Sequence, residues 1–420
     1  MHHKIQLDQL NAAGPSMVKA VEACVHCGFC LSSCPTYRVL GQEMDSPRGR
    51  IILMKQVLEG DLHLNEVSAH IDPCLGCLAC VTACPSGVQY GDLVGPFRET
   101  LESQGKRSLT HRLRQSMMMR TLPYPGRFRW AARMGRLAKP FTGIMPKPMR
   151  AMLELLPARL PPRDPLPRVN PPQAKPRARV AMLTGCVQSV IEPQISRATL
   201  DVLQTNGVEV HVPPDQGCCG ALAWHNGHGA LARRQARHNL NVFSDSIDAV
   251  ISNAAGCGSG MHEYPLMFKG TPDEHRARQF ADRVVDVSVF LDNLGLTPPP
   301  PLDQPITIAY HDACHLAHAQ GVRDAPRNLL NAIEGVTVVE IPNGEFCCGS
   351  AGTYNIDHPD VAAELGRHKV DHIRATGADL VVAGNIGCLV QIQQHLKSIP
   401  DAPRLMHTMT FLQSVYAGSF

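Results

Sequence analysis

Two short runs of the sequence carry four cysteines each at the spacing that binds an iron–sulfur cluster. The first run is CVHCGFCLSSCP and the second is CLGCLACVTACP. Both read C-x2-C-x2-C-x3-C-P, and in two-cluster ferredoxins with this spacing the fourth cysteine of each run ligates the other cluster. The spacing therefore predicts two [4Fe-4S] clusters, with these ligands: Cys24, Cys27, Cys30 and Cys84 for cluster 1, and Cys74, Cys77, Cys80 and Cys34 for cluster 2.

Zinc and disulfide bonds are the alternatives for these two runs. Structural zinc uses C-x2-C pairs separated by a longer insert, and it requires neither a third cysteine at the same interval nor a following Cys-Pro. Sixteen cysteines in a 420-residue chain whose start, MHHKIQLDQL, lacks the apolar core of a signal peptide indicate a reducing compartment, where thiols stay available as ligands. Both alternatives are therefore disfavoured, and the runs predict electron transfer.

The other eight cysteines fall in a sequence repeat. RVAMLTGC and ITIAYHDAC end in cysteines 128 residues apart, GCCG and FCCG are 129 residues apart, and DAVISNAAGC and ADLVVAGNIGC end in cysteines 131 residues apart. Three landmarks at nearly constant offset indicate a duplicated unit. Each copy supplies four cysteines, which we call the first quartet (Cys186, Cys218, Cys219, Cys257) and the second quartet (Cys314, Cys347, Cys348, Cys388).

The quartets are candidate metal sites of a second kind. We expect these cysteines at strand ends and turns, where the crevice of a parallel sheet collects ligands. They predict a further iron–sulfur cluster or a zinc ion, and the alternative is free thiols that pack as small apolar groups. His311, His315 and His318 flank Cys314, so an imidazole is available there as a replacement ligand, or simply as a hydrogen-bonding group.

The elements that position these cysteines predict an α + α/β protein. We expect an α-helical ferredoxin domain over 1–102, a basic, Pro-rich connector over 103–178, and two tandem, pseudo-repeated α/β Cys-Cys-Gly subdomains over 179–300 and 301–420. In the first domain SPRGRIILMKQVLEG predicts a helix, with Ser46 as N-cap and Pro47 at the first position. Each repeat alternates strands with helices, which favours two similar parallel α/β units that face each other.

Charge is concentrated between Ser103 and Arg150, which hold twelve Lys and Arg and no Asp or Glu, although the whole chain carries only +3. Apolar residues such as Met117 and Trp130 are interleaved. Such a stretch predicts contact with anionic lipid or an acidic partner, or a connector that lies over the cluster domain and offsets its negative charge. No nucleic-acid-binding module accompanies it, so nucleic acid is not expected as a partner.

Two further expectations concern location and tuning. No run approaches the 18 apolar residues of a membrane helix, so we expect a cytoplasmic protein, either free or peripheral on the cytoplasmic face of the inner membrane. Arg48 and Arg50, at the start of the predicted helix, either tune a cluster potential, meet a partner, or are solvated residues of a capped helix end.

With these motifs in place, the sequence resembles the iron–sulfur proteins that include the Cys-Cys-Gly components of heterodisulfide reductase and of anaerobic glycerol-3-phosphate dehydrogenase, together with the lactate-utilisation proteins. The segments ACVHCGFC, DSPRGRI, KQVLEG, CPSGVQY and EFCCGSAGTYNIDHPD are similar to the family of glycolate oxidase iron–sulfur subunits, over nearly the whole chain. That resemblance implies electron transfer from FAD-containing subunits, which oxidise glycolate to glyoxylate, towards a quinone or another acceptor. No catalytic residue is expected in this chain alone, because no G-x-G-x-x-G follows a strand.

One departure from the wider group bears on the chemistry. In the heterodisulfide reductase relatives the Cys-Cys-Gly motif ends in CxxC, and five cysteines hold non-cubane clusters. Here Gly260 and Gln391 stand at the last position. Four thiolates hold a cubane cluster, a zinc ion or nothing. For the function of the whole chain, the alternatives to a glycolate oxidase subunit are a subunit for lactate or glycerol 3-phosphate oxidation, a heterodisulfide-reductase-like protein and a zinc-stabilised interaction protein.

Overall fold

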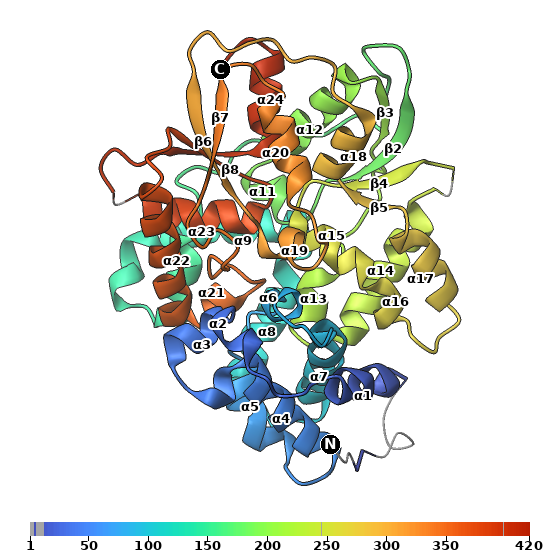
Figure 1. Cartoon of the computed structure of the whole chain (residues 1–420), viewed down its shortest axis with the longest axis vertical. Helices are drawn as coiled ribbons and strands as arrows, with labels where there is room; N and C mark the ends of the chain where they lie inside the picture. The colour runs from blue at the N-terminus through green and yellow to red at the C-terminus, as the bar shows by residue number, and fades with distance from the viewer. Residues whose placement is uncertain (1–3, 6–11, 245, 398) are drawn as a thin grey trace.

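The computed structural model describes residues 4–5, 12–244, 246–397 and 399–420. The N-terminal helices lie at one end of the molecule, and two sheets with their covering helices lie at the other end (Figure 1). None of the helices that the structure describes has the length and the apolar character of a membrane span.

The cluster-binding part is helical. Between residues 12 and 104 every regular element is a helix: α1 (Gly14–Glu22), α2 (Phe29–Ser32), α3 (Pro35–Leu40), the 3-10 helix η2 (Glu43–Asp45), α4 (Pro47–Leu58), α5 (Leu64–Ile71), α6 (Ala79–Thr82) and α7 (Tyr90–Gln104). The predicted cap of α4 is confirmed, because the Ser46 hydroxyl accepts a hydrogen bond from the amide of Gly49 at 2.9 Å. Ile51 and Met54 of the same helix lie in the core.

The basic connector is also largely helical. It forms α8 (Leu109–Thr121), α9 (Pro125–Ala138), the 3-10 helix η3 (Lys139–Ile144) and α10 (Lys147–Glu154). After α10 the Pro-rich segment runs without a helix to a two-residue strand, β1 (Val169–Asn170), which pairs antiparallel with the edge of the first sheet. This edge strand was not predicted, because a two-residue strand leaves no alternation in the sequence.

The two repeats form two sheets of the same strand order. The first sheet has the order β1, β3 (Val208–His211), β2 (Ala178–Leu183), β4 (Ala249–Ser252) and β5 (Val284–Asp286), and the second has the order β7 (Val336–Glu340), β6 (Ile306–His311), β8 (Leu380–Ala383) and β9 (Arg404–His407). All pairs are parallel except the one made by β1. The α/β prediction is confirmed, whereas the outer strands β5 and β9, of three and four residues, were missed.

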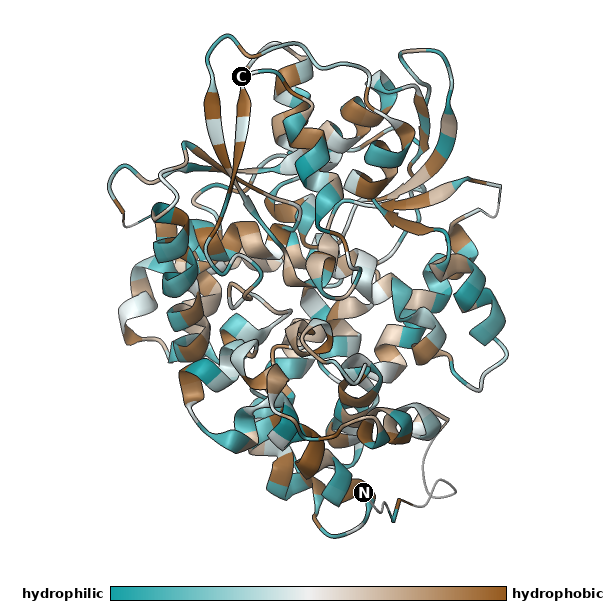
Figure 2. Cartoon of the chain, in the orientation of Figure 1, coloured by the Kyte–Doolittle hydropathy of each residue, from teal (hydrophilic) through white to brown (hydrophobic). Residues whose placement is uncertain are grey.

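Helices of one repeat pack on helices of the other. In the first repeat α12 (Gln194–Thr205) follows the first strand and α18 (Val287–Leu294) follows the last, and α20 (Asp324–Asn331) and α24 (Thr408–Tyr416) take these places in the second. Contacts run from α12 to α24 and from α18 to α20, so each repeat offers the same two helices to its counterpart. One apolar core includes strands of both sheets (Figure 2).

The helical domain is docked on both repeats. Gly95 of α7 lies so close to the buried Trp224 of the first repeat that an added Cβ would come within 3.2 Å of its ring. Arg98, also on α7, donates to the carbonyl of His225 at 3.1 Å. On the second repeat, His315 pairs with the carbonyl of Gly76 at 3.1 Å.

His407 gives the junction of the two repeats a pH dependence. Its Nε2–H donates to the carbonyl of Asn253 at 2.8 Å, and its Nδ1 accepts from the amide of Met409 at 3.1 Å, at the start of α24. Burial lowers the pKa of His407 to about 4, so the unfolded chain takes up the proton first as the pH falls. The contribution of His407 to the free energy of unfolding is therefore complete only well above pH 6.5, and about 1.4 kcal/mol of it is lost by pH 5.5.

We expect faster hydrogen exchange of the α24 amides at pH 5.5 than at pH 7.5, after correction for the intrinsic rate. His407→Gln should abolish this difference, since glutamine does not titrate. An equal difference in both proteins would contradict the assignment to His407.

Candidate iron–sulfur sites

The eight cysteines of the ferredoxin domain line two cavities. One cavity is lined by Cys24, Cys27, Cys30, Cys80 and Cys84. The other is lined by Cys34, Cys74, Cys77 and Cys80. Each cavity thus contains three cysteines of one run together with the fourth cysteine of the other run, and Cys80 borders both.

Left-handed residues between the cysteines shape both loops. His26 and Gly28 have φ of 57° and 86°, and Gly76 and Leu78 take the same places in the second run with φ of 63° and 61°. Two left-handed residues with a single residue between them turn the chain repeatedly in the same direction. Side chains that are three residues apart therefore converge. Proline then begins α3 after the first run. In the second run one of the left-handed residues is Leu78, for which this conformation is strained. Such backbone strain is typical of ligand-binding loops.

Arg50 places a buried positive charge beside the second cavity. It is 1% exposed, donates to Thr36 Oγ1 at 2.9 Å and to the carbonyl of His70 at 2.7 Å, and lies 3.9 Å from Cys34 Sγ. Burial raises the pKa of the Cys74 thiol, but Arg50 and Arg98 outweigh burial and bring it below its ordinary value. Of the alternatives for Arg50, a solvated residue is wrong, because the guanidinium lies inside the domain.

Two other thiols of this cavity, Cys77 and Cys80, lack such compensation. Burial, together with neighbouring cysteines, raises the pKa of Cys77 and Cys80 well above the ordinary value. Crowded buried thiols of this kind release their protons when a cation binds them. The donor set therefore fits an iron–sulfur cluster, which takes up and passes on single electrons when bound.

The structure gathers all four cysteines of the first quartet. Cys186 Sγ lies 3.4 Å from Cys218 Sγ, and Cys219 is hydrogen-bonded to both Cys218 and Cys257. Hydrogen bonds from Cys186 and Cys219 lower the pKa of Cys218 well below its ordinary value. A cavity that is also lined by Tyr124, Arg234 and His238 reaches Cys186 and Cys218 from outside.

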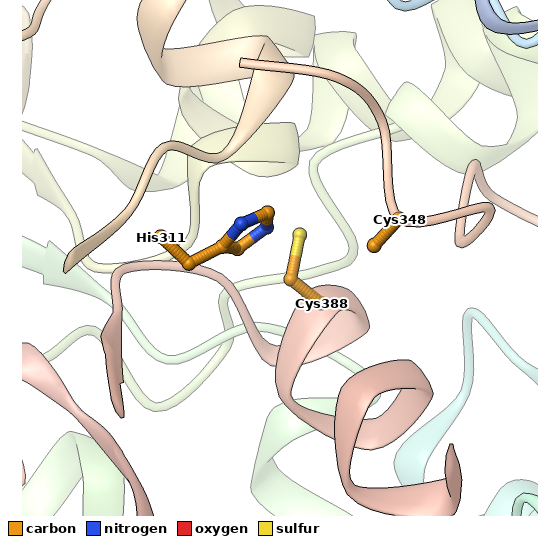
Figure 3. Close-up of side chains that lie close together, drawn as sticks. All are labelled: His311, Cys348 and Cys388. Atoms are coloured by element: carbon orange, nitrogen blue, oxygen red, sulfur yellow. The ribbon is translucent and has the colours of Figure 1, made fainter. Parts of the chain in front are cut away.

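The second quartet has the same sequence of contacts. Cys347 is hydrogen-bonded to Cys314 and Cys348, and Cys348 to Cys388. A ring nitrogen of His311, Cys348 Sγ and Cys388 Sγ lie within 4.8 Å of one another, and their side chains converge on one space (Figure 3). Burial lowers the pKa of His311, so its ring is neutral at pH 7.

The position of three quartet cysteines differs from the prediction. We expected them at strand ends or turns, but Cys257 lies on α15 (Ala255–His262), Cys388 on α23 (Ile386–Leu396), and Cys314 begins α19 (Cys314–Ala317). The backbone is extended only up to Ala254 and Asn385, which serve as N-caps, and the glycines before Cys257 and Cys388 are already helical.

Gly260 and Gln391, which replace a fifth cysteine, are both committed to packing. A Cβ on Gly260 would lie 2.3 Å from the Cβ of Ala221, so no side chain fits there. Gln391 is buried, donates to the carbonyl of Ala362 at 3.0 Å and accepts from Asn355 at 3.1 Å. Position 260 therefore has no room for a further thiolate, and the side chain at position 391 is held by hydrogen bonds within the second repeat.

The three histidines near Cys314 have different roles. His315 contacts Gly76, as described above, and His318 contacts Thr82 Oγ1 at 3.0 Å and the carbonyl of Glu345 at 3.1 Å. These two histidines serve the interface with the ferredoxin domain, whereas His311 lies with the cysteines. Arg48 is partly exposed and pairs with Glu43 at 2.8 Å.

Two residues beside the second quartet were not predicted from the sequence. Lys369 is 2% exposed and Asn385 donates to Cys388 Sγ at 3.3 Å. For Lys369 a signal existed, because it lies on the buried stripe of α22 (Pro359–Arg374) with Leu365 and Ile373. A lysine on an apolar stripe needs a buried partner, which makes such a residue a candidate for a site.

The second cavity of the ferredoxin domain adjoins the second quartet. Cys77 and Cys347 belong to one buried apolar cluster, and Cys314 packs against it. The quartets also adjoin each other, because α15 packs on α19, and Asn385 Oδ1 accepts from the amide of Gly256 at 3.4 Å. The cysteine sites thus form a continuous series from the cavity of Cys24, Cys27 and Cys30 to the first quartet.

Fold and cysteine geometry together define an iron–sulfur electron-transfer protein. Residues 20–88 match the 4Fe-4S dicluster domain family, and residues 180–262 and 308–393 each match the Cysteine-rich domain family, which confirms both the ferredoxin prediction and the repeat.

Similar proteins of known name identify the family within this class of iron–sulfur proteins. The chain is 35% identical over 398 residues to the glycolate oxidase iron–sulfur subunit of Escherichia coli K12, covering 92% of each chain. It is 36% identical over 389 residues to the probable glycolate oxidase iron–sulfur subunit of Bacillus subtilis 168, covering 88% of each. Lactate utilization protein A of Bacillus cytotoxicus is 30% identical over 237 residues, which is 56% of this chain and 99% of that protein. The chain belongs to the family of glycolate oxidase iron–sulfur subunits.

Proposed function

We propose that this chain relays electrons from FAD-containing subunits, which oxidise glycolate to glyoxylate, towards a quinone or another acceptor. The observation that carries the proposal is the continuous series of cysteine sites inside a chain that matches glycolate oxidase subunits over about nine-tenths of its length. Lactate utilization proteins match only 56% of it, which favours glycolate over lactate. The cysteines hold the clusters, and no residue of this chain acts on glycolate.

The proposed cofactors are two [4Fe-4S] clusters with the crossed ligand sets, and a cluster at each quartet. The shared lining of the two cavities supports the crossed sets. Two matched quartets of mutually bonded thiols support occupancy, since free thiols have no need to converge four at a time. Zinc at the quartets is the alternative.

The test is anaerobic purification of the chain with its flavoprotein partners, followed by addition of glycolate. Glycolate should bleach the visible cluster absorption, and lactate should not. About eight irons per chain correspond to the ferredoxin clusters alone, and about twelve or sixteen to one or both quartets filled. A colourless, zinc-containing chain that glycolate does not affect would refute the proposal.

Electrons enter at cluster 1 in this proposal. Cys27 is exposed, and Val25 and Phe29 beside it are 63% and 66% exposed. Exposed apolar side chains around a cofactor loop favour a docking surface, because they gain from being covered. The occupant we propose is the FAD-containing subunit, since electron transfer requires its flavin to come close to cluster 1.

Phe29→Glu should slow reduction of the clusters by glycolate and the partner at least about tenfold, because a buried charge opposes docking. Reduction by dithionite, which needs no docking, should be unchanged. Val169→Glu, at a 51% exposed position on β1, is the control. Equal slowing with dithionite would show damage to cluster 1 rather than loss of docking.

The second contact we propose is with an anionic membrane surface, through α9 and η3. Trp130, Met134, Leu137 and Phe141 follow each other at intervals of three or four residues and are 48–70% exposed. Exposed arginines such as Arg133 lie on the same helix. An exposed apolar stripe with cationic neighbours is the pattern of helices that lie on anionic bilayers. On such a bilayer the chain passes electrons to a quinone in the membrane.

Trp130→Glu should reduce co-sedimentation with phosphatidylglycerol vesicles at least about tenfold, since the indole loses about 1.5–3 kcal/mol of apolar burial. Val169→Glu should bind as the unmodified chain does, and neutral phosphatidylcholine vesicles should bind poorly. If Trp130→Glu instead released the flavoprotein subunits, this surface would belong to the partner.

A further inference from the structure

The two quartets have different surroundings, although their cysteines correspond one to one. His311 is the last residue of β6, three residues before Cys314. The corresponding residue of the first repeat is Leu183, the last residue of β2 and three residues before Cys186. Both side chains are buried. The second quartet therefore has a nitrogen donor at a position where the first has an alkyl group.

Among the described residues, the hydrogen bonding of His311 is confined to the second quartet, where its ring contacts Cys348. His311 is 1% exposed, and neither ring nitrogen has a nitrogen or oxygen partner among the described residues. A buried imidazole needs a hydrogen-bonding or ligand partner, because burial without one is unfavourable. A ring nitrogen of His311 lies within 4.8 Å of Cys348 Sγ and of Cys388 Sγ, and Figure 3 shows the three residues together. A buried imidazole that faces two thiolates is arranged as a ligand.

A second difference is a buried cation. Lys369 donates to the carbonyls of Asn343 and Gly344, at 3.4 and 2.7 Å, and no carboxylate of the described residues forms an ion pair with it. Ala362 packs against Gly349 as Ala232 packs against Gly220, so Lys369 corresponds to Asn239, seven residues beyond Ala232.

Asn239 is neutral and hydrogen-bonds to backbone groups at Gly217 and Cys218. A buried ammonium group that forms no ion pair requires a nearby anion. Cys348, Cys347 and Cys388 act on Lys369 electrostatically more than Asp312 does, and Asp312 already pairs with Arg327.

Resting on the proposed function, in which the quartets hold clusters, we propose that His311 is a ligand of the second centre and that Lys369 is its counter-ion. The second centre then has four thiolates and an imidazole, and the first has four thiolates alone. The neutral imidazole adds no negative charge to the second centre, and the nearby cation, Lys369, makes added negative charge easier to accept. The second centre should thus have the higher reduction potential of the two.

The direct test is pulsed EPR on the anaerobic chain labelled with 15N-histidine. The signal of the second centre, identified as the one lost in Cys348→Ser, should show strong 15N coupling. His311→Leu, which installs the residue of the first repeat, should remove that coupling. His318→Gln should keep it, because His318 bonds to Thr82 and Glu345.

Lys369→Asn should keep the coupling and shift the midpoint potential of the same signal to a more negative value. A second centre without 15N coupling in the unmodified chain would overturn the assignment of His311, whatever the folding of the variants. If Cys348→Ser lost no iron, or lost zinc instead, the proposed cluster at this quartet would itself be wrong, which is a different result.

Discussion

Cys34→Ser is expected to leave a chain with cluster 1 intact and cluster 2 lost, although Cys34 belongs to the first run. Cys84→Ser should do the reverse. The reason is the lining of the two cavities, in which Cys34 lies with Cys74 and Cys77, and Cys84 lies with Cys24 and Cys27. Each variant should lose about four irons, and glycolate-dependent electron transfer to the acceptor should fall to background.

Iron and sulfide analysis gives the number of clusters lost, and EPR of the reduced protein tells which one. The two variants are matched controls for each other, because each removes one thiol at the same place in its run. The crossed ligand sets would be refuted if Cys34→Ser lost the cluster of Cys24, Cys27 and Cys30. Loss of both clusters in both variants would mean that the domain folds only when both are bound.

Arg50→Met should have a large effect on stability. The guanidinium is almost fully buried, and its removal leaves the Asp45 carboxylate, 3.7 Å away, with His70 as its remaining partner. Breaking a buried pair of this kind costs about 3–5 kcal/mol. Arg48→Met is the control two residues away. Its partly exposed pair with Glu43 is worth at most about 1 kcal/mol, and the variant also loses the hydrogen bond to the carbonyl of His26 at 3.1 Å.

Arg50→Met should also change the electron affinity of cluster 2. A positive charge beside Cys34 and Cys74 stabilises the reduced cluster, so its removal should move the midpoint potential to a more negative value, with cluster 1 much less affected. Redox titration followed by EPR separates the two clusters. An unchanged potential together with lower thermal stability would make Arg50 purely structural.

The elements with a strong local signal were predictable. Ser46 and Pro47 define the start of α4 whatever surrounds it, and the offsets between matched cysteines define the repeat. Cluster ligands were predictable as a set for the same reason, since spacing alone makes three thiolates converge. Short elements such as β5 were missed because three residues carry no periodicity and form only when the neighbouring strand is in place.

Features that depend on tertiary contacts were not predictable. The burial of Arg50 results from the packing of α4 between Thr36 and His70, which are far from it in the sequence. His311 could be singled out as a candidate but not separated from His315 and His318. Only the docking of the helical domain, which engages those two, makes the distinction.

The docking of the helical domain on both repeats has a consequence for the speed of the whole complex. Because Gly95 lies against Trp224, and His315 is held by Gly76, the cysteine sites are brought together once, when the chain folds. No swinging arm carries charge between them. Turnover inside this chain is then insensitive to solvent viscosity, and any viscosity dependence of the complex originates where separate molecules meet, at the flavoprotein or the acceptor.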